Sequence, residues 1–256
     1  MTTSSRSAPP FPDPRASRPT RRPGAAELLR PTFKRTIFHT YDNLGAFVLA
    51  NLVWIALSIP IITAPAATAA LFDLGRRAAG GEPVGVKQLG GAFRRHFVPA
   101  LRLALFDLVV AALLWFNVDF YSHLGSWATL PGFLLAGLMI WVAGFWILMH
   151  AHLLPVLVGG ERRFAHLLRK SALLTLDNLG YTIGVTVQAL ALLAISLLTG
   201  AGFLLVGGSL VAVLLSTGHR ELLAKYAPPA PGEEDPAETR GLRDLFRPWE
   251  APRTRR

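Results

Sequence analysis

Polar side chains are rare in the long apolar segments of this 256-residue chain, so the few that occur there are the first candidates for chemistry. Asp107 is the strongest of them, because a charged group inside a membrane span is expected to have a function. Its alternative role is structural, since Arg102 lies about a turn and a half earlier on a predicted helix and would neutralise it near the interface. Asn51, Asn117 and Gln188 are also polar at or near membrane depth, where amides typically form hydrogen bonds between helices.

A second group of candidates interrupts the first apolar run. Pro60 and Pro65 flank Thr63, and each proline disfavours a continuous helix because it lacks a backbone N–H and its ring clashes with the preceding turn. Transporters place their binding sites at broken helices near the middle of the membrane. Pro60, Thr63 and Pro65 are therefore candidates for lining a path, together with Asp107.

The sequence offers no complete metal or catalytic motif. His150 and His152 are two residues apart, which separates them by about 200° around a helix. Asp119 and His123 have a spacing of four residues, but two ligands make a weak site. The chain has no cysteine, and residues 80–87 depart from a phosphate-binding loop because the lysine does not follow the last glycine directly. We therefore predict no catalytic residue, no metal site and no cofactor, and a protein that is not an enzyme.

The elements that carry these residues are long hydrophobic helices. The chain is 52% hydrophobic and only 16% charged, with a mean hydropathy of +0.40. Residues 43–72, 120–160 and 178–219 contain no Asp, Glu, Lys or Arg. A bilayer core requires about 20 apolar residues per helix. The sequence therefore predicts an integral membrane protein whose chief partner is the lipid bilayer.

The basic residues predict the orientation. All 26 Lys and Arg residues fall in four blocks, namely before residue 44, at 76–102, at 162–170 and from 220 onward. Cytoplasmic loops carry the excess of Lys and Arg in membrane proteins, so we place every block and both termini in the cytosol. The same distribution explains the net charge of +10 without a nucleic acid as partner. Arg outnumbers Lys by 22 to 4, which suggests a GC-rich bacterial genome and hence a bacterial cytoplasmic membrane.

These observations predict an all-α, polytopic transmembrane helix bundle with six hydrophobic segments arranged as three hairpins. The hairpins pair residues 44–62 with 66–77, 97–120 with 130–158, and 178–199 with 202–219. The alternative has five segments, in which residues 44–72 form one kinked helix and the N-terminal tail lies outside. Six is favoured because an even number of passes keeps both basic flanks of the first run on one side.

The chain divides into a membrane domain and two tails. Residues 1–25 and 227–256 are rich in Pro and Arg and have too little apolar surface to fold alone, whereas residues 26–226 form the predicted helical domain. Each hairpin follows a basic, aromatic-containing segment, at residues 33–35, 93–95 and 162–164. We expect these segments to form helices in the plane of the interface that contact anionic lipid headgroups.

Several short segments resemble a known family. Asn-Leu-Val-Trp at residues 51–54, Ile-Pro-Ile-Ile-Thr at 59–63 and Ala-Ala-Thr-Ala-Ala-Leu at 66–71 are similar to the opening of the YesL-like family of bacterial integral membrane proteins. Members of that family have no assigned activity and are often encoded near carbohydrate importers. The resemblance implies an accessory or regulatory component of a carbohydrate transport system, with permease subunits as partners. The alternative is a small-solute transporter in its own right.

Overall fold

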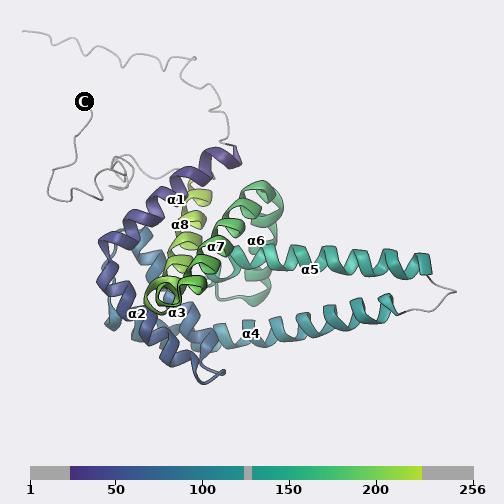
Figure 1. The fold of residues 1–256 in the computed structure, drawn as a ribbon, viewed down its shortest axis with the longest axis horizontal. Helices are drawn as coiled ribbons and strands as arrows, with labels where there is room; N and C mark the ends of the chain where they lie inside the picture. The colour runs from purple at the N-terminus through teal and green to yellow at the C-terminus, as the bar shows by residue number, and fades with distance from the viewer. Residues whose placement is uncertain (1–23, 124–128, 227–256) are drawn as a thin grey trace, which may run out of the picture.

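The computed structural model describes residues 24–123 and 129–226, so the two predicted tails lie almost wholly outside the described residues. Within those ranges the chain forms helices and no strands, which confirms the all-α prediction. Figure 1 shows the arrangement. The helices are α1 Ala25–Asp42, α2 Leu44–Ser58, α3 Ala64–Ala79, α4 Val86–Ser122, α5 Thr129–Val158, α6 Phe164–Asp177, α7 Leu179–Thr199, the π-helix η2 Phe203–Gly207 and α8 Gly208–Ala224.

The helix boundaries follow the prolines and the polar residues of the sequence. α2 ends two residues before Pro60, and Pro65 lies in the first turn of α3, where a missing N–H costs no helical hydrogen bond. The predicted break in the first apolar run is therefore confirmed. Asn43 separates α1 from α2, and the two helices meet at 89°.

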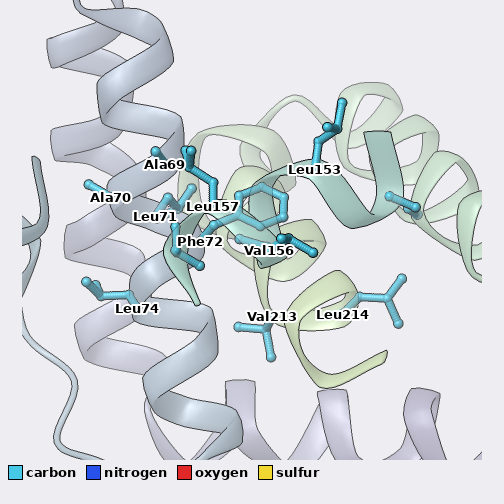
Figure 2. Packing of buried hydrophobic residues seen from close by; sticks show 14 of the residues in the cluster. Ala69, Ala70, Leu71, Phe72, Leu74, Leu153, Val156, Leu157, Val213 and Leu214 are labelled. Carbon is cyan, nitrogen blue, oxygen red and sulfur yellow. The ribbon is translucent and has the colours of Figure 1, made fainter. Parts of the chain in front are cut away.

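α3 is the central helix of the fold and packs against α4, α8, α5 and α2. Its buried residues are mostly small, because alanines let neighbouring helices approach closely: Ala66, Ala67, Ala69, Ala70, Gly75, Ala78 and Ala79. Larger apolar side chains complete the core between α3, α5 and α8 (Figure 2). Leu71, Leu153 and Leu214 are each 1% exposed or less.

α4 and α5 extend well beyond the other helices as a two-helix projection (Figure 1). We call residues 104–122 of α4 and 129–148 of α5 the arm. Among the described side chains of the arm, only the small residues Gly132 and Ala136 are buried. Large apolar side chains cover most of its surface, and Trp115 and Trp141 are 78% and 80% exposed. Such a surface requires an apolar environment.

Four helices are long and apolar enough to cross a membrane, namely α4, residues Leu130–Val158 of α5, α7, and η2 with α8. A fifth span exists if the bent pair of α1 and α2 counts as one. These helices indicate a membrane protein. Neither the six-segment count nor the five-segment alternative is confirmed, because α2 has only 15 residues and the bent pair joins α2 to α1 rather than to α3. Residues 93–95 lie inside the 37-residue α4, so they form no separate helix in the plane of the interface.

Candidate functional site

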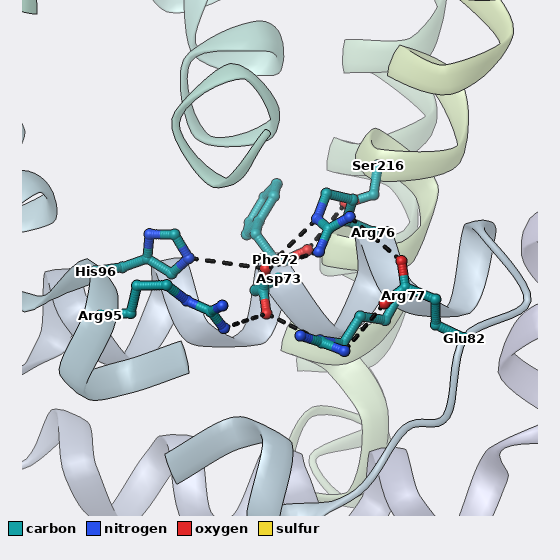
Figure 3. A network of polar contacts seen from close by, with 8 residues as sticks. All are labelled: Phe72, Asp73, Arg76, Arg77, Glu82, Arg95, His96 and Ser216. Atoms are coloured by element: carbon teal, nitrogen blue, oxygen red, sulfur yellow. Dashed lines mark hydrogen bonds and ion pairs between the residues drawn. The ribbon is translucent and has the colours of Figure 1, made fainter. Parts of the chain in front are cut away.

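The most highly connected polar side chain in the interior is Asp73 of α3 (Figure 3). Its carboxylate is 2% exposed and lies 3.3 Å from Nη2 of Arg76, 3.1 Å from Nε of Arg77 and 3.3 Å from Nη2 of Arg95. Nε2 of His96 lies 3.7 Å from the same carboxylate. One buried anion thus joins the end of α3 to α4.

The charged residues around Asp73 are brought together by their spacing along α3 and by the loop that follows this helix. Arg76 and Arg77 follow Asp73 at spacings of three and four residues, which places all three on one face of α3. The loop after α3 turns at Gly81, whose φ of +71° favours glycine. It returns Glu82 to both arginines, at 3.5 Å from Nη1 of Arg76 and 3.0 Å from Nη1 of Arg77. We call Asp73, Arg76, Arg77, Glu82, Arg95 and His96 the Asp73 cluster.

The cluster keeps Asp73 ionised. Burial alone would raise the pKa of its carboxyl group, but His96, Arg77, Arg76 and Arg95 favour the charged form more strongly. The pKa of Asp73 is therefore held well below its ordinary value of 3.8. Sequence reasoning did not single out Asp73, although its spacing from two consecutive arginines is a signal that would have found it.

A cavity of about 480 Å³ lies beside the cluster. The end of α3 with Arg76 and Glu82 forms one part of its wall, and the end of α5 with the loop after it, Lys170 of α6 and the end of α8 form the other parts. The remaining lining residues are Ala79, Gly80, Pro155, Val156, Gly159, Gly160, Glu161, Ser216, His219, Arg220 and Leu223. One part of the cavity wall is therefore charged, another is formed by glycines and a third is apolar.

This region brings together all four basic blocks of the sequence. Arg76, Lys170 and Arg220 from three of them line the cavity. Arg35 from the first block forms an ion pair with Glu221, the residue after Arg220. Described residues from each of the four blocks thus meet at one end of the fold, which we call the basic end. Their convergence fits the prediction that they lie on one side of a membrane, and the identity of that side stays a prediction.

Asp107 lies away from this site and pairs with a histidine of the neighbouring helix. Its Oδ2 is 3.3 Å from Nε2 of His150 on α5, and the other ring nitrogen of His150 donates to the carbonyl oxygen of Trp146 at 2.8 Å. The predicted neutralisation by Arg102 is absent among the described contacts, because His150 takes that place. Each ring nitrogen of His150 lies beside an oxygen acceptor, but a neutral imidazole carries only one N–H. For both contacts to be hydrogen bonds, one further proton must therefore lie between His150 and Asp107.

Asn51 is fully buried and connects α2 to the π-helix η2. Its Nδ2 donates to the carbonyl oxygens of Phe203 and Leu204 at 2.9 and 2.8 Å, and its Oδ1 accepts from the backbone N–H of Ser209 at 3.1 Å. A π-helix leaves backbone groups that an α-helix would satisfy, and the carboxamide supplies both the donor and the acceptor that they require. Asn51 therefore acts as the interhelical link that its type predicts.

The remaining predicted residues are not brought together. Pro60 is exposed, and Thr63 donates to the carbonyl oxygens of Pro60, at 2.8 Å, and of Leu57, so this segment is a self-contained turn. Pro65 only begins α3. Asn117 bonds within α4, to the carbonyl oxygen of Leu113. Oε1 of Gln188 is buried and has no hydrogen-bond partner among the described residues.

The histidines rejected as a metal pair indeed point to different partners. His150 contacts Asp107, whereas Nε2 of His152 lies 3.0 Å from Oγ1 of Thr182 and its ring lies 6.0 Å from that of His219. Within residues 24–123 and 129–226, no group of three or more potential metal ligands occurs.

Comparison with known proteins yields one partial match. No curated protein and no solved structure matches the chain. The finer resemblance to the YesL-like family stays a prediction. Residues 47–118, which run from α2 through α3 and most of α4 and include the Asp73 cluster, match a family described as a protein of unknown function, DUF624.

Proposed function

We propose that this protein is a non-enzymatic accessory or regulatory component of a membrane transport system, and that the system carries carbohydrates. The observation that carries the proposal is the apolar surface of the arm. The choice of carbohydrates rests on the resemblance of residues 51–71 to the YesL-like family. The basic end would face the cytosol of a bacterial cytoplasmic membrane, in keeping with its excess of Lys and Arg.

The arm supports association with helices of other proteins. α4 and α5 are the two longest helices, and over the arm each has the other as its main neighbour (Figure 1). Trp115, Phe116 and Trp141 are among the most exposed aromatic side chains of the described chain. Membrane helices associate through van der Waals packing, and the exposed apolar faces of the arm are available for such packing. An arm with two free faces offers a permease subunit more contact area than the packed helices around α3.

Photo-cross-linking in native membranes tests this proposal. A photoreactive amino acid is placed at Trp115 or Trp141 in the arm, and at Leu198 of α7, which is 88% exposed, as a control. The arm positions are expected to cross-link to permease subunits, and mild-detergent purification is expected to recover the same subunits. Repeated recovery of the protein alone, without cross-links from the arm, would contradict the accessory role.

A second candidate function, a small-solute transporter, is favoured by the pair of Asp107 and His150. The two side chains lie on facing helices, and the pair requires one shared proton. Carboxylate and histidine pairs at membrane depth are the groups from which proton relays of pumps and transporters are built. A transporter with this pair would couple solute movement to protons.

Solute uptake into proteoliposomes that contain only this protein distinguishes the two functions. A transporter is expected to show uptake driven by a pH gradient that is lost in Asp107→Asn but retained in Asp119→Asn, whose carboxylate is 62% exposed at the tip of the arm. Uptake that Asp107→Asn leaves unchanged would remove this residue from the mechanism. Absence of uptake, together with cross-links from the arm, would favour the accessory role.

A further inference from the structure

The cavity at the basic end has the dimensions of a ligand site. Its volume of about 480 Å³ lies within the range of pockets that bind small molecules. Three parts of the chain that are distant in sequence form its wall, so the cavity is a product of the tertiary fold. The accessory role rests on the arm and does not account for this cavity.

Two cations of the wall lack a counter-charge. Lys170 and Arg220 line the cavity, and in the part of the chain that the structure describes neither has an ion-pair or hydrogen-bond partner. They come from α6 and α8, and both side chains are exposed. Arg76 differs, because its guanidinium group already forms ion pairs with Asp73 and Glu82. Lys170 and Arg220 therefore remain available to an anion.

His219 also lines the cavity, and one of its ring nitrogens is buried. Nδ1 of His219 is inaccessible to solvent and has no hydrogen-bond partner among the described residues. A buried nitrogen without a partner is uncommon in folded proteins, since its desolvation is then uncompensated. Because Nδ1 has no accessible surface, a ligand in the cavity does not reach it in this structure, and His219 contributes only its other ring atoms to the wall.

The charge balance of the region favours an anionic ligand. The Asp73 cluster contains three arginines and two carboxylates, and the other side chains of the cavity wall add Lys170, Arg220 and Glu161. Five cations and three carboxylates leave a net charge of +2 when the histidines are neutral. Glu161 also accepts a hydrogen bond from the backbone N–H of Arg163 at 3.3 Å.

We propose that this cavity binds a phosphate group. Lys170 and Arg220 contact its oxygens. Both cations suit this ligand, because guanidinium and ammonium groups form strong, charge-assisted hydrogen bonds with phosphate oxygens. Pro155, Val156 and Leu223 supply an apolar wall for the remainder of the ligand. The phosphate belongs either to an anionic lipid headgroup or to a soluble phosphate ester.

Binding to the full chain in an uncharged detergent tests the proposal. The probes are phosphatidylglycerol, phosphatidylcholine and glycerol 3-phosphate, with affinities measured by native mass spectrometry for the lipids and by calorimetry for the soluble probe. The test variant is Lys170→Gln/Arg220→Gln. The control is Arg94→Gln/Arg102→Gln, which changes two exposed arginines of α4 outside the cavity. Both variants change the net charge from +10 to +8, so they weaken non-specific attraction equally.

We expect the test variant to lose about tenfold or more in affinity for at least one phosphate probe, while the control stays within about twofold. Selective binding of phosphatidylglycerol identifies a lipid headgroup, and binding of glycerol 3-phosphate identifies a soluble ester. The single variant Lys170→Gln is expected to show an intermediate loss. The proposal is overturned if neither anionic probe binds, if phosphatidylcholine binds equally well, or if both double variants lose affinity to the same extent.

Discussion

The body of the protein, by which we mean residues 24–103 and 149–226, and the arm use the same residue types in opposite settings. In the body, Asp73 is 2% exposed and is surrounded by three arginines and His96. At the tip of the arm, Asp119 lies 3.5 Å from His123, with side chains that are 62% and 77% exposed. Ion pairs in water contribute little, whereas a buried carboxylate must keep its partners. The difference shows that burial and the number of partners, and not residue type, decide what a carboxylate contributes.

The apolar residues show the same contrast. In the body, Phe47 is fully buried, whereas Trp141 of the arm is 80% exposed. The packing of the body therefore comes from contacts within the chain. The apolar surface of the arm is left for lipid or for other proteins, so a substitution there should affect association rather than folding. Each of the following experiments pairs a position in the body with a matched position that lacks its contacts.

The largest effect among the polar side chains is expected from Asp73→Asn. This change leaves three arginines facing a neutral amide, and the loss of one partner of a buried ion pair costs about 3 kcal/mol or more. We use the lower end of the range because Arg95 is 52% exposed. Asp119→Asn is expected to cost less than about 1 kcal/mol. Denaturation in detergent micelles measures the free energy of unfolding of both variants. Equal losses would contradict the expected difference between the buried and the exposed carboxylate.

The contribution of Asp73 is also expected to depend on pH. Because its pKa is lower in the folded protein than in the unfolded chain, the stabilisation is fully present above the ordinary value of 3.8 and is lost as the pH falls toward the folded pKa. The stability difference between the native protein and Asp73→Asn should therefore be present at about pH 5 and shrink below about pH 4. Thermal unfolding across this range is the measurement. A difference that does not shrink below about pH 4 would contradict the assignment.

Gly75→Ala tests the close approach of α3 to α8. A Cβ atom at this position would lie 2.7 Å from the carbonyl oxygen and 2.8 Å from the carbonyl carbon of Ala212, so the backbones must separate. We expect a loss of about 1–3 kcal/mol, as for other overpacked cores. Gly90→Ala in α4 is the control, because a Cβ atom there meets nothing within 4 Å. The control should be neutral or stabilising by up to about 1 kcal/mol, and a similar loss in both variants would show that packing is not the cause.

Asn51→Ala is expected to remove the link between α2 and the π-helix. It leaves the carbonyl oxygens of Phe203 and Leu204 and the N–H of Ser209 without their present partner. Unsatisfied buried groups cost about 1–3 kcal/mol. Asn117→Ala should be nearly neutral, because its side chain is only half-buried and bonds only within α4. Unfolding in micelles compares the two, and equal stability would show that water replaces Asn51.

The smallest effect is expected from Trp141→Ala in the arm. Since this side chain makes few contacts within the chain, the stability in detergent should change by less than about 0.5 kcal/mol. Phe47→Ala is the counterpart in the body and should cost about 3–5 kcal/mol. Thermal unfolding measures both. A large loss in Trp141→Ala would mean that the arm is stabilised from within, and would weaken the proposal that its surface serves a partner.

Local features of the sequence predicted the helices well. Pro60 and Pro65 mark the break between α2 and α3, because proline acts on its own turn. The uncharged runs predicted apolar helices from their length alone. The polar role of Asn51 was also predicted, although its partner in the π-helix was not. The identity of such a partner depends on a contact with residues about 150 positions later in the chain.

The sequence by itself determined that the chain is helical and apolar and that its basic residues occur in four blocks, because composition, run length and charge order are properties of the linear chain. Only the tertiary structure decided that α3 is the central helix rather than a lipid-facing span, and that Asp107 pairs with His150 rather than being neutralised by Arg102. It also decided that Asp73 and the cavity beside it lie where the basic blocks meet. Burial and pairing depend on which helix faces pack together, and segments far apart in sequence settle this jointly.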